Sequence, residues 1–256
     1  MGHFFSDWYY LSIRNIKQIW RPLLALLPSI LIPIFFFWVG AQSFSAVAQL
    51  PGFPTESYLL FIAPLAIFMA IFFSSGNAGI ELVVDISSGY FNKLIIMPIN
   101  KLAIIFAKLT EVAVQALMQG LIVLIFLLLF TDVRPATGIP GIIVMFTMLV
   151  IFAMAWSNLS MIFALRTKNP RLVQSLFIIV FPFLYITTAQ VPREFLPETF
   201  ARLAAWNPVT YVIEGTRALM LSSWGDPAIW KGFAVAIALF VVLVSITFYS
   251  FKKVLK

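Results

Sequence analysis

Three polar side chains with regular spacing interrupt an otherwise apolar run, and they are the first candidates for chemistry in this sequence. They are Glu111, Gln115 and Gln119, four residues apart. On an α-helix this spacing places all three on one face. Because polar groups are costly in an apolar environment, that face should meet protein or water. It could line a substrate route, or it could join helices through hydrogen bonds worth about 0.6–2 kcal/mol each. Lys108, three residues before Glu111, could neutralise its carboxylate.

Aromatic side chains in two other apolar runs offer a second kind of site. One run carries Phe35 within the sequence FFFW, and the other carries Phe181 and Tyr185. Flat aromatic surfaces can hold a lipophilic substrate. In a chain that is 16% aromatic, they could equally be lipid-facing or core residues. We take these three aromatic residues, together with the polar face, as possible lining of a substrate pathway.

Covalent and metal chemistry have little support in the sequence. There is no cysteine, and the single histidine, His3, cannot form a metal site alone. The phosphate-binding pattern GxxxxGK[ST] is absent, as are HExxH and GxSxG. The sequence therefore predicts that the chain is not an enzyme and contributes no cofactor, nucleotide or metal site of its own.

The composition indicates an integral membrane protein that is entirely α-helical. Hydrophobic residues make up 62% of the 256 residues, charged residues make up 11%, and the mean hydropathy is +1.01. The apolar runs have the length of membrane-spanning helices rather than of barrel strands. No cleavable signal peptide is expected at the N-terminus. We predict one domain, residues 1–256, with an interfacial helix at 4–21 and six spans. The spans are 23–39, 58–80, 109–130, 142–165, 172–188 and 233–251.

The positive charges predict how the chain lies in the membrane. Twelve of the 17 Lys and Arg residues fall in the N-terminal segment, the loops after spans two and four, and the C-terminal tail. The positive-inside rule therefore places these parts and both termini in the cytoplasm of a multi-pass cell (inner or plasma) membrane protein. Most of the basic residues that give the net charge of +7 then lie at the cytoplasmic membrane surface, and no nucleic-acid partner is expected. A seventh span at 209–222 is rejected because it would bury Glu214 and Arg217 in lipid.

The loop after span two predicts a short helix at the membrane surface. Residues 85–100 read DISSGYFNKLIIMPIN and follow Glu81, which shares a helix face with Asp85. Phe91, Leu94 and Ile95 fall on one side of this helix, and we expect a partner's groove to bury them. Pro98 should end the helix. The loop could also be an ordinary connection that merely obeys the charge rule.

The long connection at 190–226 predicts two short helices on the outer side. Asn207 followed by Pro208 is a helix-starting pair, with asparagine as the cap. We expect the helices to meet there and to dip at most partway into the bilayer. Glu214 and Arg217 are three residues apart on the second helix.

Together these parts resemble the membrane (permease) subunit of an ABC-2 type exporter, the class of drug and polysaccharide exporters. Gly89, Leu94 and Pro98 match the family pattern G-x-x-x-x-L-x-x-x-P. The sequence NPVTY with a later arginine matches its element NP-x-x-Y…R through Asn207, Pro208, Tyr211 and Arg217. Asp85 to Ser88 stand where the family usually has a charged E-K/R-E-R run.

The resemblance implies partners that carry the ATP chemistry. It implies separate ABC ATPase subunits that bind ATP and Mg²⁺, and a homodimer or a similar second permease subunit in the lipid bilayer. The substrate would be a lipophilic or amphipathic molecule: a drug, a lipid or a lipid-linked glycan. The implied ATPase-coupling residues are Gly89, Tyr90, Phe91, Lys93, Leu94, Ile95 and Pro98. The implied outer-hairpin residues are Asn207, Pro208, Tyr211, Glu214 and Arg217.

Two other functions remain open from the sequence. A secondary transporter or channel would be expected to show ion ligands at mid-membrane or repeated broken helices. A membrane scaffold would need no transport path at all.

Overall fold

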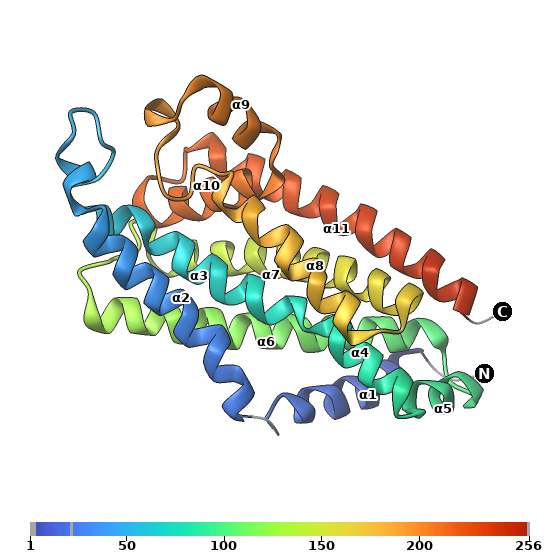
Figure 1. Cartoon of the computed structure of the whole chain (residues 1–256). Coiled ribbons are helices and arrows are strands. Elements are labelled where there is room, and N and C mark those ends of the chain that lie inside the picture. Colours follow the sequence, from blue (N-terminus) through green and yellow to red (C-terminus); the bar gives the residue numbers. More distant parts are fainter. Residues whose placement is uncertain (1–3, 21–22, 255–256) are drawn as a thin grey trace.

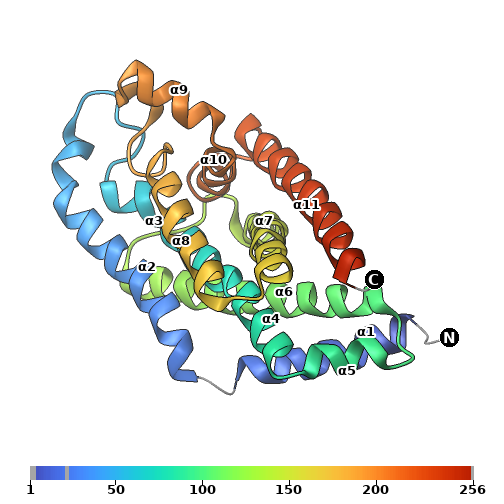
Figure 2. The same ribbon diagram turned by 45° about the vertical axis from the view of Figure 1, so that its right-hand side comes forward.

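Long helices packed side by side form an elongated bundle in the computed structural model (Figure 1), which describes residues 4–20 and 23–254. All regular elements assigned within those ranges are helices. Helix α1 and the C-terminal end of α11 lie at one end of the bundle, and α9 lies toward the other (Figures 1 and 2). The α-helices are α1 Phe4–Ile19, α2 Leu23–Ser43, α3 Tyr58–Gly76, α4 Ala78–Ser87, α5 Tyr90–Ile96, α6 Lys101–Phe130, α7 Gly138–Thr167, α8 Pro170–Tyr185, α9 Glu198–Trp206, α10 Pro208–Leu221 and α11 Pro227–Val254, with short 3₁₀ turns at Ser45–Gln49 and Arg193–Phe195.

Four helical stretches of the described chain are long and apolar enough to cross a membrane. They are Tyr58–Ser87, Lys101–Phe130, Gly138–Thr167 and Pro227–Lys253. The other two predicted spans coincide with shorter apolar helices, Leu27–Ser43 and Pro170–Tyr185. The chain is therefore a multi-pass membrane protein, and crossing by α2 and α8 stays a prediction.

The third predicted span is longer at its start than the sequence suggested. Helix α6 begins at Lys101 rather than at residue 109 and has 30 residues. At a rise of 1.5 Å per residue it is about 45 Å long, against a hydrocarbon thickness of roughly 30 Å. Its first turns therefore extend toward the membrane surface, next to α1 and α5.

Helix α3 is the centre of the bundle. It packs against α2, α6, α7 and α10, and Phe61, Phe68 and Phe72 on it are almost fully buried. In the most apolar stretch of Tyr58–Ser87, 83% of the residues are buried, whereas in the corresponding stretch of Pro227–Lys253 only 17% are buried. The continuous apolar sequence of α3 thus has neighbours on all sides, whereas α11 presents most of its surface outward.

A break divides the second span into α3 and α4. Helix α3 ends at Gly76, and α4 begins after Asn77. The Ser160 hydroxyl of α7 donates to the Gly76 carbonyl at 2.7 Å and accepts from the Gly79 N–H at 3.0 Å. A Cβ on Gly79 would lie 2.1 Å from Ser160 Oγ, so glycine permits this close approach. The sequence analysis treated the stretch as the end of a span and did not anticipate the break.

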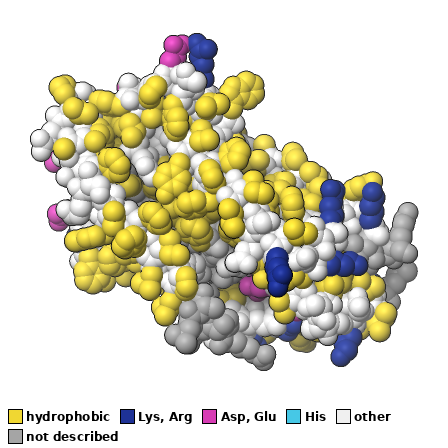
Figure 3. All heavy atoms as spheres, viewed as in Figure 1, with side chains coloured by type: hydrophobic (Ala, Val, Ile, Leu, Met, Phe, Trp, Pro, Cys, Tyr) yellow, Lys and Arg dark blue, Asp and Glu magenta, His cyan; other side chains and the backbone are white. Residues whose placement is uncertain are grey.

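Charged side chains are unevenly distributed over the surface. On the face shown in Figure 3, most Lys and Arg side chains gather at the end where α1, α5 and the end of α11 lie, and an apolar band covers the middle. A broad band without charges is what lipid tails require. Which side of the membrane the basic end faces stays a prediction.

Candidate functional site

The loop between α4 and α6 contains the short helix that the sequence predicts. The chain turns at Gly89, whose φ of 75° favours glycine, and α5 then runs from Tyr90 to Ile96. Pro98 is the second residue after the helix. The Asn100 side chain accepts from the Leu102 N–H at 3.0 Å and so caps α6. The helix therefore ends just before Pro98, as the sequence analysis predicts.

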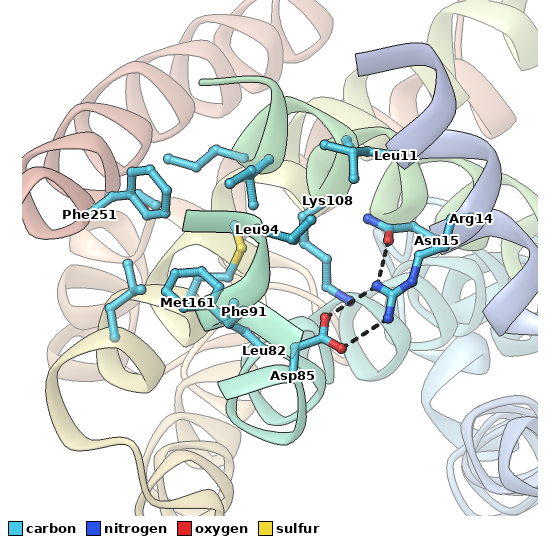
Figure 4. Close-up of a pocket in the computed structure, with 15 residues that line it drawn as sticks. Leu11, Arg14, Asn15, Leu82, Asp85, Phe91, Leu94, Lys108, Met161 and Phe251 are labelled. Atoms are coloured by element: carbon cyan, nitrogen blue, oxygen red, sulfur yellow. Dashed lines mark hydrogen bonds and ion pairs between the residues drawn. The ribbon is translucent and has the colours of Figure 1, made fainter. Parts of the chain in front are cut away.

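The apolar face of α5 points into the chain itself, and the expectation that a partner groove buries it is wrong. Phe91 and Leu94 are buried, and the Phe91 ring meets Phe251 of α11 edge to face, with centroids 5.9 Å apart. These residues line one side of a cavity of about 30 Å³ (Figure 4). Phe251, near the C-terminal end of α11, thus lies against α5, and Ile95 is half-buried.

The outward side of α5 is a different set of residues. Asn92 and Lys93 are exposed, Ile96 is 82% exposed and Met97 is 47% exposed. We call these four residues the outer face of α5. Isolated exposed apolar residues are normal on proteins, but Ile96 and Met97 are adjacent and lie beside a lysine. The sequence analysis did not identify these two exposed apolar residues.

Helix α1 is fastened to both ends of this loop. The Asp7 carboxylate accepts from the Asn100 N–H at 2.8 Å. Arg14 pairs with Asp85 at 3.2 Å (Figure 4), and its guanidinium carbon lies 3.8 Å from the Tyr90 ring centroid. Arg14 therefore provides the counter-charge for Asp85, the one charged residue among residues 85–88.

A second charge cluster joins α4 to α6 beneath the loop. Lys108 pairs with Glu111 at 2.8 Å, as predicted, and also with Glu81 of α4. Lys108 and Glu111 are buried, and buried charges are tolerated only when they are paired. Sequence reasoning placed Glu81 and Asp85 on one face of α4 but could not name Lys108 and Arg14 as their partners.

The residues proposed for the pathway do not converge within one subunit. Glu111, Gln115 and Gln119 are buried on α6, which packs against α1, α3 and α7. Neither polar atom of the Gln119 side chain has a hydrogen-bond partner among the described residues. In contrast, Phe35 is exposed on α2, and the Phe181 ring lies tilted against Phe73 and edge to face with Tyr185.

Two cavities border α2. One of about 250 Å³ lies between α2 and α3, with Phe36, Phe37 and Tyr185 in its wall. The other, of about 380 Å³, lies between α2, α8 and the α3–α4 break, and Asn77, Gln174 and Phe177 line it. Only Tyr185 of the predicted pathway residues lines either cavity. Phe35 and Phe181, the other two aromatic candidates, line neither cavity.

The 190–226 connection forms two helices that meet at the predicted junction. Asn207 lies between α9 and α10, and its Oδ1 accepts from the Val209 N–H at 3.0 Å. Its Nδ2 donates to the carbonyls of Phe183 and Ile186 at 2.6 and 2.8 Å. The residues that match the family's NP-x-x-Y element therefore hold the end of α8 against α10. Tyr211 adds a bond to the Ala205 carbonyl at 2.8 Å.

Glu214 and Arg217 both bind the segment that follows α8. Glu214 accepts from the Thr188 hydroxyl at 2.8 Å, and Arg217 donates to the Ala189 carbonyl at 2.7 Å. The Arg217 guanidinium also lies over the Phe61 ring at 3.8 Å. Helix α10 packs against α3, α7 and α11, so α10 forms part of the bundle as well as of the hairpin.

Comparison with known proteins identifies the family of this chain. The family model described as ABC-2 type transporter matches residues 6–221. The chain is 28% identical to the putative transport permease ycf38 of Pyropia yezoensis over 247 residues, which cover 90% of this chain and 83% of that protein. It is 23% identical to the daunorubicin resistance ABC transporter permease protein DrrB1 of Streptomyces coeruleorubidus over 220 residues, 82% and 76% of the two chains. The chain therefore belongs to the ABC-2 type transporter family.

Proposed function

We propose that this chain is the transmembrane subunit of an ATP-driven exporter, and that separate ATPase subunits power it. The observation that carries the proposal is the loop containing α5. This loop joins two long membrane helices, is tied to α1 at both ends, and presents an exposed outer face. A subunit without nucleotide chemistry needs such a surface to receive mechanical work from a partner.

The outer face of α5 is where the ATPase would bind. Phe91 and Leu94 act indirectly, because they hold α5 against α11. Ile96 and Met97 are free to enter a groove on the partner, and buried apolar anchors at an interface contribute most of its binding energy. Lys93 would sit at the rim and favour an acidic partner surface.

Movement of α5 would reach the membrane through α4. The Arg14–Asp85 and Lys108–Glu81 pairs connect α4 to α1 and α6, so the three helices would move together. The break at Asn77 supplies a point at which α4 can tilt relative to α3. A change at the ATPase would thereby alter the packing of the central helix.

We propose a lipophilic or amphipathic cargo that leaves the cytoplasm or the inner leaflet. The two cavities beside α2 are lined mainly by apolar and aromatic side chains with a few polar groups, as is usual for sites that bind such molecules. The name of the Streptomyces relative, a daunorubicin resistance permease, supports a drug-like cargo. A second copy or a similar subunit would complete the path, with both termini in the cytoplasm of the cell membrane.

Purification from native membranes tests this proposal. The tagged chain should retain an ABC ATPase, and lipophilic compounds should stimulate ATP hydrolysis by the complex. Purification without an ATPase, together with transport driven by an ion gradient, would favour a secondary transporter. If the purified chain retains no ATPase and shows no transport, the result would favour a membrane scaffold.

A further inference from the structure

A groove on the exposed side of α1 shares only Arg14 with the proposed transport mechanism. It has a volume of about 380 Å³ and is lined by Tyr10, Ile13, Arg14, Lys17 and Gln18. The opposite side of α1, with Ser12, Asn15 and Ile19, is buried and packs against α6. The groove therefore opens outward from the bundle.

The groove has an excess of positive charge. Arg14 is balanced by Asp85, whereas Lys17 is exposed and has no ion pair among the described residues. The Arg14 guanidinium uses only its NH1 and NH2 groups for Asn15 and Asp85. A guanidinium has five N–H donors, so donors remain for an anion placed between Arg14 and Lys17.

The surroundings of the groove are those of a membrane interface. Phe5 and Tyr9 are exposed on α1, and Trp20 is exposed directly after its end; exposed aromatic residues of an amphipathic helix mark the headgroup level. Tyr10 and Ile13 give the groove itself an apolar wall. An anion that is attached to lipid tails matches this combination better than a freely soluble anion does.

We propose that the α1 groove binds the phosphate headgroup of an anionic phospholipid. Arg14 and Lys17 would hold the phosphate oxygens, and Tyr10 and Ile13 would contact the glycerol and the first part of the chains. Arg14 also holds Asp85 at the end of α4. The lipid would therefore bind next to the joint between α1 and the α5 loop.

Lipid binding to the purified full-length chain tests the proposal. Phosphatidylglycerol and phosphatidylcholine are added to the detergent-solubilised protein, and bound lipid is counted by native mass spectrometry. Phosphatidylglycerol should bind more tightly. Because one basic residue near a membrane surface contributes about 1 kcal/mol of attraction, Lys17→Ala should lower phosphatidylglycerol affinity about fivefold. Lys252→Ala makes the same charge change on an exposed residue at the end of α11 and should leave binding unchanged.

Three results would overturn the proposal. Equal binding of the two lipids would mean that the groove does not recognise the anion. Equal losses in Lys17→Ala and Lys252→Ala would mean that only the overall charge matters. Displacement of phosphatidylglycerol by excess inorganic phosphate would indicate a site for soluble anions. None of these outcomes depends on an ATPase, so the site and the exporter function stand or fall separately.

Discussion

At the scale of single residues, Lys108 is the most consequential charge in the structure. It lies between Glu81 and Glu111, and the lysine and Glu111 are both buried. Removing the lysine would leave two carboxylates close together, one of them buried without a counter-charge. Removing one partner of a buried pair costs about 3–5 kcal/mol.

Lys108→Met should therefore destabilise the protein by about 3 kcal/mol, at the lower end of that range because Glu81 is partly exposed. Thermal unfolding of the detergent-purified chain measures this effect. Lys93→Met, which removes an exposed lysine, is the control and should be nearly neutral. Adding Glu111→Gln to Lys108→Met should restore part of the lost stability. A double variant no more stable than Lys108→Met would show that the unpaired carboxylate is not the cause.

Gly79 is a residue at which the addition of a single side-chain carbon should disturb the packing. An added Cβ would lie 2.5 Å from the backbone oxygen of Ser160 as well as close to its hydroxyl, so α4 and α7 would have to separate. Gly79→Ala should destabilise the protein by about 1–3 kcal/mol, the usual cost of overpacking. Ser87→Ala, at an exposed site on the same helix, should be neutral by the same unfolding measurement. Equal stability of the two variants would contradict the close contact.

At the scale of elements, α5 separates into an inner face that stabilises the subunit and an outer face available to a partner. Because truncating a buried phenylalanine costs about 3–5 kcal/mol, Phe91→Ala should lower the unfolding temperature. Ile96→Ala with Met97→Ala should leave that temperature unchanged and weaken ATPase binding, measured by co-purification. The opposite pattern, with binding lost only in Phe91→Ala, would place the contact elsewhere.

The local parts of α5 were predictable from the sequence, and its orientation was not. Pro98 and Asn100 act on residues within a few positions of themselves, so the end of α5 and the cap of α6 follow from residue type. The neighbour of Phe91 is Phe251, which is far along the chain and belongs to a different helix. An apolar stripe shows that a face is buried and does not identify what buries it. The same reason hid the Lys108–Glu81 pair and the separation of the pathway residues.

At the scale of the whole molecule, the arrangement in the membrane rests on the predicted distribution of basic residues. The chain has no cysteine, so single cysteines can be introduced at Ser45, Asn92, Lys168 and Thr199. A membrane-impermeant thiol reagent added to intact cells should label positions 45 and 199 only. Labelling at position 92 instead would reverse the orientation and place the α5 loop outside, beyond the reach of a cytoplasmic ATPase.

Uptake into inside-out membrane vesicles tests the central claim that an ATPase drives this subunit through the outer face of α5. The vesicles contain this chain and its co-purifying ATPase, and the cargo is a fluorescent lipophilic dye. We predict uptake that requires ATP and is largely lost when Ile96 and Met97 are both changed to Asp, while the variant subunit keeps its wild-type unfolding temperature. Uptake that proceeds without ATP, or that continues unchanged in this folded variant, would contradict the account.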